Sequence, residues 1–168
     1  MSTFVRASKQ STFVAIDFET ANVKRDSACA VGLVRVERGR ITAREHLLVR
    51  PPSRWFQFTN IHGITWQHVE DAPTWKEVWR EVKPLMAGCD FLAAHNAPFD
   101  QSVLEACCAR WDVPVRLPPF VCTLQLARKR WDLKPAKLPD VARFLGLKLR
   151  HHDALSDAEA CARIVLAA

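Results

Sequence analysis

The sequence predicts an α/β fold, a five-stranded mixed sheet with helices on both faces. Three strand-like segments joined by short turns come first, and helices then alternate with two more strands, which is the order typical of a mixed sheet covered by helices. The chain has 168 residues, of which 49% are hydrophobic and 25% are charged, so it can form one domain with a full core. We expect a flexible lead-in over residues 1–11 and the domain over residues 12–168.

The first strand is expected over about residues 12–18, and the acids Asp17 and Glu19 stand at its far end. Apolar residues on both faces indicate a strand in the middle of a covered sheet. Side chains two positions apart point the same way along a strand, so the two carboxylates lie side by side. Two ionised acids at a buried edge repel each other, and a hard divalent cation such as Mg²⁺ or Mn²⁺ would relieve that repulsion.

Periodicity, turns and caps predict the remaining elements. Thr74 and Glu77 have the spacing of a capping box, and Asn96 is the expected cap of a later helix. The irregular, aromatic-rich stretch 50–72 is expected to be a functional loop. The other expected strands cover about residues 29–36, 40–49, 90–95 and 120–122, and the expected helices cover about residues 74–86, 96–111, 123–129, 138–145 and 154–168.

Composition narrows the class of protein. The net charge of +6 and the pI of about 9.2 suit a polyanionic partner, although a solvated basic surface explains them equally well. The 6 cysteines lack paired spacing, and most fall in apolar runs, so we expect reduced core residues in a cytoplasmic protein. Residues 1–10 lack the apolar core of a signal peptide, and no apolar run is long enough for a membrane span, so we expect no membrane partner.

Two further acids stand in the first turns of expected helices. Asp100 and Asp157 would each, taken alone, more commonly complement a helix dipole. Together with the two acids of the first strand, they support the hypothesis of a divalent-metal site built from four carboxylates. His151 and His152 lie in the loop just before Asp157, where a histidine could accept a proton from an attacking water.

Three motifs resemble those of the DEDDh family of 3′→5′ exonucleases, which is similar to the proofreading epsilon subunit of bacterial DNA polymerase III. They are Asp17-Phe18-Glu19-Thr20, then Asn96-Ala97-Pro98-Phe99-Asp100, then His152-Asp153-Ala154-Leu155-Ser156-Asp157-Ala158. The resemblance runs from about Thr12 to the C-terminus and implies a ribonuclease H-like fold. The sister branch of the family uses a catalytic Tyr, and its absence from this chain excludes that branch.

The resemblance implies hydrolysis of phosphodiester bonds with two ions of Mg²⁺ or Mn²⁺, releasing nucleoside 5′-monophosphates from a nucleic acid with a free 3′ end. It implies that Asp17 is a ligand of both ions, that Glu19 and Asp157 complete the ligands of one ion and that Asp100 supports the other ion. It also implies that His152, which has the family spacing to Asp157, is the general base. His151 is then an adjacent surface or phosphate-contacting residue.

Four residues are candidates for binding the terminal nucleotide. Ile61-His62-Gly63-Ile64-Thr65 resembles a family segment that lies along that nucleotide. The candidates are Phe18, Thr20, His62 and Phe99, and for Phe99 a place in the core is an equal alternative. Many family members follow the first motif with a Thr- and Gly-containing turn, which Ala21-Asn22 replaces here.

Several functions fit these residues. We favour DNA as the substrate. We also favour a free-standing exonuclease, because the chain ends within the last expected helix and lacks the extension that tethers the epsilon subunit. The alternatives are an exoribonuclease of the same family and a proofreading subunit that acts with a polymerase. A catalytically inactive nucleic-acid-binding module is a different class, and the presence of all five motif residues argues against it. Residues 128–137, which are rich in Lys and Arg, either track phosphates, with Trp131 as a stacking surface, or form a solvated connector, and the connector is slightly preferred.

Overall fold

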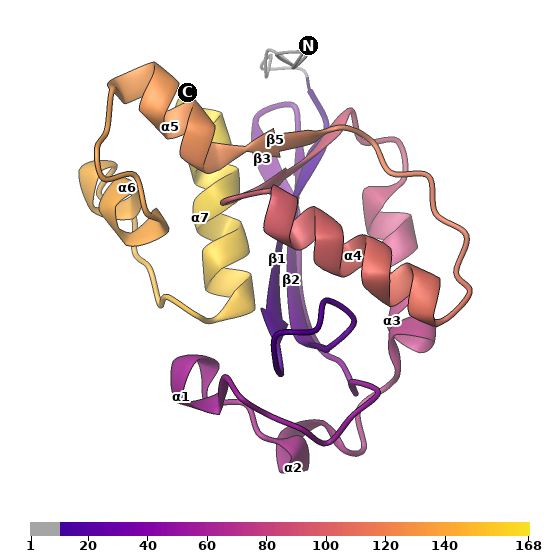
Figure 1. Ribbon diagram of the computed structural model, residues 1–168. Helices are drawn as coiled ribbons and strands as arrows, with labels where there is room; N and C mark the ends of the chain where they lie inside the picture. Colours follow the sequence, from indigo (N-terminus) through magenta and orange to yellow (C-terminus); the bar gives the residue numbers. More distant parts are fainter. Residues whose placement is uncertain (1–10) are drawn as a thin grey trace.

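The computed structural model describes residues 11–168, in which a five-stranded sheet lies between two layers of helices (Figure 1). The strands are β1 (Phe13–Thr20), β2 (Ala28–Glu37), β3 (Arg40–Leu48), β4 (Phe91–Ala94) and β5 (Phe120–Cys122). Their order is β3-β2-β1-β4-β5. β2 pairs antiparallel with both β1 and β3, and β4 pairs parallel with both β1 and β5. The predicted mixed sheet is confirmed, with β1 at its centre.

Helices cover both faces of the sheet, as predicted. They are α1 (Thr59–His62), α2 (Trp66–Val69), α3 (Trp75–Met86), α4 (Pro98–Arg110), α5 (Thr123–Trp131), α6 (Leu138–Phe144) and α7 (Ala154–Ala167). Val14, Ile16 and Phe18 of β1 pack with α3 and α4, whereas Phe13 and Ala15 pack with α5, α6 and α7. Alternate residues of β1 therefore enter two separate cores, and the acids that follow Ala15 at steps of two face the α7 side.

Three expectations about the elements need correction. β1 does not end near Phe18 but continues to Thr20, because its pairing with β2 extends to Ala28 across a register shift. Asn96 is not the cap of α4, since Ala97 takes that position while Asn96 has a φ of 62° and accepts a hydrogen bond from the Phe99 amide (2.9 Å). The stretch 50–72 contains α1 and α2, which are too short to produce a helical period.

Other expectations concern the chain's start and its cysteines. Residues 1–10, including the absence of a signal peptide predicted there, lie outside the described residues, and the sheet begins beside Thr12, whose amide donates to Asp90 Oδ2 (2.9 Å). All six cysteines are free thiols, and four of them are buried. Within residues 11–168, no helix combines the length and the apolar character that a membrane span needs.

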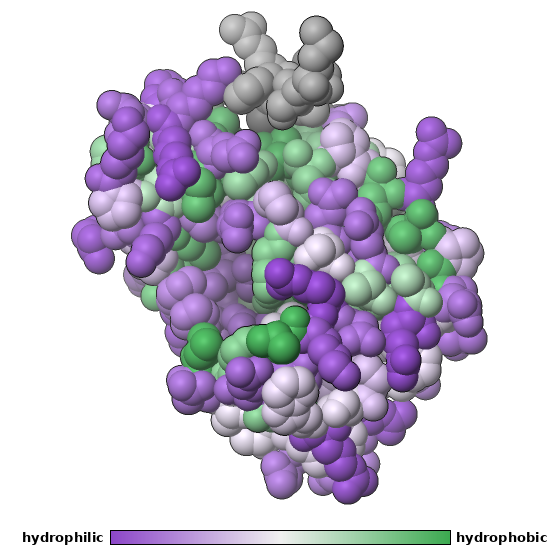
Figure 2. All heavy atoms as spheres, viewed as in Figure 1, coloured by the Kyte–Doolittle hydropathy of each residue, from purple (hydrophilic) through white to green (hydrophobic). Residues whose placement is uncertain are grey.

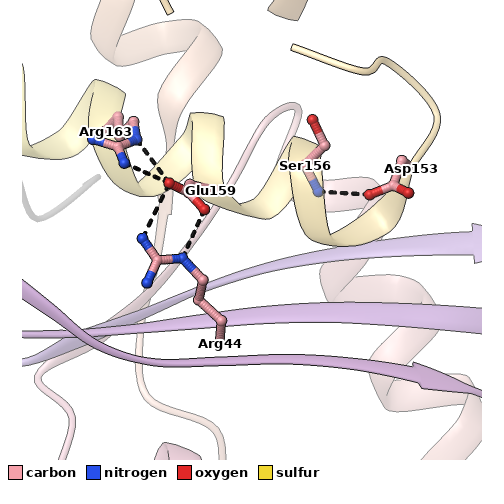
Figure 3. Close-up of polar contacts among 5 residues, drawn as sticks. All are labelled: Arg44, Asp153, Ser156, Glu159 and Arg163. Carbon is pink, nitrogen blue, oxygen red and sulfur yellow. Dashed lines mark hydrogen bonds and ion pairs between the residues drawn. The ribbon is translucent and has the colours of Figure 1, made fainter. Parts of the chain in front are cut away.

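Side chains at the start and in the middle of α7 set its position on the sheet (Figure 3). The Asp153 carboxylate caps the helix by accepting a hydrogen bond from the Ser156 amide (2.9 Å). Farther along, Glu159 binds Arg44 of β3 (2.8 Å) and Arg163 one turn later. These contacts fix where α7 begins and how it is aligned with β2 and β3.

Gly32 of β2 allows the first turn of α7 to lie directly on the sheet. A Cβ atom at this position would be 2.1 Å from the Ala154 carbonyl oxygen and 2.5 Å from the Leu155 amide nitrogen. Such distances are far inside van der Waals contact, so only glycine permits this approach. Gly32 is also paired with Asp17 across β1 and β2, which places the contact beside the acids of β1.

We predict that Gly32→Ala lowers the free energy of unfolding by about 3 kcal/mol, because the added methyl group overpacks rigid backbone. The matched control is Gly88→Ala, where the φ of 68° strains the backbone but no atom of residues 11–168, apart from the two adjoining residues, lies within 4 Å of the new Cβ atom. The control should lose only about 1 kcal/mol. If chemical denaturation gave equal losses in the free energy of unfolding for the two variants, the close contact of Gly32 with α7 would not be what excludes a side chain at this position.

Candidate active site

A cavity of about 290 Å³ opens at the end of β1, where α1, α4 and the first turn of α7 converge. On the face shown in Figure 2 the molecule is hollowed just above α1. All nine residues predicted to form the site line this cavity: Asp17, Phe18, Glu19, Thr20, His62, Phe99, Asp100, His152 and Asp157. The sequence motifs, which are far apart along the chain, therefore meet in one place.

Three carboxylates form the centre of the cavity. Asp17 and Glu19 project from β1 and Asp157 from α7, and one oxygen from each lies within 4.8 Å of the others. Asp157 Oδ2 accepts hydrogen bonds from His151 Nδ1 (2.9 Å) and the His152 amide (3.0 Å). Asp157 Oδ1 is buried and has no hydrogen-bond partner within residues 11–168. A buried, unpartnered oxygen beside two more carboxylates is the pattern expected where a cation completes the site.

Asp100 approaches the same point from the other face of the sheet. It lies in the first turn of α4 and is 2% exposed, and its Oδ1 accepts a hydrogen bond from the Phe18 amide (3.0 Å). Its carboxylate lines the cavity without joining the group of three that share the 4.8 Å limit. The predicted convergence of four acids is thus resolved into a close group of three and one acid anchored to β1.

Burial and mutual repulsion make these acids reluctant to ionise. Burial, with a further contribution from Asp157 and Asp100, raises the pKa of Glu19 to about 8. Burial also raises the pKa of Asp100 to about 8 and places that of Asp17 well above its usual range. Protons or a cation must therefore compensate the cluster at neutral pH. An all-oxygen donor set of this charge fits a hard divalent ion.

The two histidines that precede α7 have different roles in the structure. Their rings are stacked with centroids 3.8 Å apart, and the backbone of His152 has a φ of 67°. Burial, and then the neighbouring His151, lower the pKa of His152, so its ring is neutral at pH 7 and can accept a proton. His151, expected at the surface or on a phosphate, is exposed, and its Nδ1 also binds Asp157. A contact across an irregular loop has no period in the sequence, which is why it was missed.

The residues proposed to hold a nucleotide differ in how freely they face the cavity. Both ring nitrogens of His62 are used, since Nε2 lies 3.1 Å from the Thr20 carbonyl oxygen and Nδ1 accepts from the Ile64 amide (3.0 Å). The Phe18 ring is 4% exposed and packs on Trp75, with ring centroids 5.5 Å apart.

Two other features singled out in the sequence have structural partners. The Phe99 ring is covered by the Arg25 guanidinium, 4.5 Å from the ring centroid. Asn22 belongs to the Ala21-Asn22 pair that replaces the Thr- and Gly-containing turn of many family members. It is buried, and its side chain donates to the Trp55 carbonyl oxygen (2.8 Å) and accepts from the Lys24 amide (2.9 Å). The turn after β1 is therefore held by hydrogen bonds to the loop that precedes α1.

His95 also lines the cavity, although no role was predicted for it. Its ring bonds with Thr123 Oγ1 and with the Ala136 carbonyl oxygen, each at 2.9 Å. Burial lowers the pKa of His95 to about 4, so the ring stays neutral and donates to Ala136. The signal in the sequence that could have predicted this role is a histidine directly after an apolar strand. Through its two hydrogen bonds, His95 connects the end of β4 to α5 and to the connection before α6.

Comparison with known proteins agrees with this geometry. The family model described as "Exonuclease" matches residues 14–165. A PolC-type DNA polymerase III from Oceanobacillus iheyensis is 34% identical over 156 residues, which is 90% of this chain and 11% of the polymerase. A PolC-type polymerase from Caldanaerobacter subterraneus is 33% identical over 165 residues, which is 95% of this chain and 12% of the polymerase. The chain therefore spans only a small part of the length of these relatives.

Solved structures show the same fold. Exonuclease X in complex with 5′ overhanging duplex DNA aligns with a TM-score of 0.74 at 26% identity, covering 92% of this chain and 89% of that one. The nuclease domain of 3′hExo, a DEDDh family member bound to rAMP, aligns with a TM-score of 0.79 at 20% identity, covering 95% and 92%. Because the family match takes in all four carboxylates and His152, the chain belongs to the exonuclease family, as a DEDDh-type member with the ribonuclease H-like fold.

Proposed function

We propose that this exonuclease removes nucleoside 5′-monophosphates from the 3′ end of a nucleic acid, with DNA as the favoured substrate. The observation that carries the proposal is the group of Asp17, Glu19 and Asp157, in which one oxygen from each lies within 4.8 Å of the others and Asp157 Oδ1 has no hydrogen-bond partner among residues 11–168. A protein that only binds nucleic acid has no need for three repelling carboxylates at the end of a buried strand.

The donor set supports two ions of Mg²⁺ or Mn²⁺, which when bound would activate water and stabilise the charge that develops on the phosphate. Asp17, central in the cluster, would contact both ions. Glu19 and Asp157 would hold one of them, and Asp100 would support the other. The hydrogen bonds from His151 and His152 to Asp157 orient its carboxylate toward the cluster.

His152 is the proposed general base. Its neutral ring lies at the cavity beside Asp157, where it would take a proton from the attacking water. Thr20, His62, Phe18 and Phe99 line the same cavity and would enclose the terminal nucleotide. Since the His62 nitrogens are bonded to backbone, its contribution would be to shape the wall near Thr20.

The substrate and setting rest on the relatives. Exonuclease X, seen with duplex DNA, is matched over 89% of its length, which supports DNA as substrate and a free-standing enzyme. Two alternatives have support among the relatives. The PolC-type polymerases are consistent with an exonuclease that acts together with a polymerase. The 3′hExo domain, which is bound to rAMP and has the same fold, is consistent with an exoribonuclease. We also propose a cytoplasmic location, in keeping with six free cysteines.

Asp17→Asn or Asp157→Asn should lower the rate of mononucleotide release on the order of 1000-fold, because each removes a charge that the ions require. The assay uses 5′-labelled DNA and RNA strands of the same sequence, single and double, with Mg²⁺ or Mn²⁺. Glu45→Gln, which removes an exposed charge from β3, is the control and should keep full activity. Undiminished digestion by either site variant would refute the metal assignment, and faster digestion of RNA would refute the preference for DNA.

His152→Ala should reduce kcat by about 100-fold or more with little change in KM, because it removes proton transfer without removing a binding contact. The acidic limb of the pH–rate profile should disappear with it. His151→Ala should cost only about 10-fold and keep that limb, since His151 acts through Asp157. If the two variants exchange these behaviours, His151 is the base.

Without metal, the protein should lose stability as the pH rises from about 5 to 8. The acids of the site have a higher pKa folded than unfolded, so the folded state binds more protons in this window and its advantage is lost as they dissociate. We expect the melting temperature in EDTA to fall by about 5 °C or more across this range, and Mg²⁺ to restore it at pH 8. Asp17→Asn should flatten the dependence, whereas Glu45→Gln should leave it unchanged; a rise in stability with pH would contradict the electrostatics.

A further inference from the structure

The positive charge of the chain is concentrated in residues 128–150, called here the basic segment. It comprises the end of α5, the connection to α6, α6 itself and most of the loop before α7. It contains eight Lys and Arg residues against two Asp, a net charge of +6, which is the net charge of the whole chain. The remaining residues are balanced, with 16 basic and 16 acidic side chains.

All eight basic side chains of this segment are exposed; they are Arg128, Lys129, Arg130, Lys134, Lys137, Arg143, Lys148 and Arg150. Its two acids neutralise little of this charge, because the pairs of Lys134 with Asp132 (3.1 Å) and of Arg143 with Asp140 (3.6 Å) are solvated. Hydrophilic side chains accordingly gather over α5 at the upper left of Figure 2. A surface of this kind attracts polyanions.

The basic segment borders the active-site cavity at two points. Leu138, the first residue of α6, lines the cavity, and the preceding Ala136 is held by the hydrogen bond from His95. Arg150, the last residue of the segment, directly precedes His151, which also lines the cavity. From Leu138 to Phe144 the helix rises about 9 Å, a distance that a stacked strand covers in about three nucleotides.

An exposed aromatic ring stands at the far end of this path. Phe144 is 53% exposed, and its ring packs against that of Trp131 with centroids 5.8 Å apart. The exposed Phe144 ring lies within the same segment as the exposed basic side chains, so it is available to stack on a base. Aromatic rings combined with basic side chains are how proteins bind single strands without reading their sequence.

We propose that the basic segment is the binding surface for the single strand upstream of its 3′-terminal nucleotide, with Lys137, Arg143 and Lys148 on the phosphates and Phe144 under a base. The inference rests on the proposed function, because it takes the 3′ end to lie in the cavity. The chemistry recognised is the phosphodiester backbone with unpaired bases, which DNA and RNA share.

The test compares two triple variants that remove the same charge. Lys137→Ala/Arg143→Ala/Lys148→Ala alters the basic segment, and Lys76→Ala/Arg80→Ala/Lys83→Ala alters exposed residues of α3 on the other face of the sheet. Binding of fluorescent 12-nucleotide dT and rU strands is measured by anisotropy in EDTA over a series of salt concentrations. The first variant should bind both strands at least about 10-fold more weakly and lower the salt slope by about 2, as expected for three lost phosphate contacts.

The α3 variant should bind nearly as tightly as the parent, and Phe144→Ala should bind about 10-fold more weakly with an unchanged salt slope. Equal affinities of the two triple variants would overturn the proposal, as would a selective loss of binding to anionic vesicles with none on the strands. Loss on only one of dT and rU would contradict recognition of the shared backbone and would point to recognition of the sugar or the base. Binding is measured without metal, so a negative result in this binding test is distinct from a lack of nuclease activity in the parent enzyme. Only the lack of activity would refute the proposed function.

Discussion

Repulsion among carboxylates at the end of β1 is the constraint on which the rest of the structure depends. Asp17, Glu19 and Asp157 are brought within 4.8 Å in a place where burial raises the pKa of each. Nothing within the cluster stabilises this arrangement, so the surrounding fold must hold it. The capped and anchored start of α7, the glycine under it and the histidines before it all serve to keep Asp157 against the sheet.

The two layers of helices contribute to the site in different ways. α7 brings a carboxylate to the face on which Asp17 and Glu19 lie, whereas α4 brings Asp100 from the opposite face to the backbone of β1. The helices thus position groups around a strand end without crossing it. Separate cores on the two faces make this possible, because each helix is fixed by its own apolar contacts.

Sequence reasoning predicted most of this arrangement, because long periodic elements and caps depend on local chemistry. The capping box of Thr74 and Glu77 is present as expected, and Asp100 and Asp157 occupy the predicted first turns. What it missed depends on distant contacts. Gly32 reads as one residue of a strand until Ala154 is seen above it, and His95 reads as a strand end until its bonds to Thr123 and Ala136 appear. Similarly, the αL conformation of Asn96 follows from how the chain leaves β4, which no capping preference reveals.

The bond between Asp100 and the Phe18 amide has a consequence for the shape of the sheet. β4 pairs with β1 only from Phe13 to Ala15, so beyond that point no strand of residues 11–168 borders β1 on its β4 side. The Asp100 carboxylate takes the place of a strand carbonyl there, satisfying a backbone donor that a longer β4 would have satisfied. The shortness of β4 therefore leaves the end of β1 open to α4 and to the cavity that Phe18, Asn96 and Asp100 line.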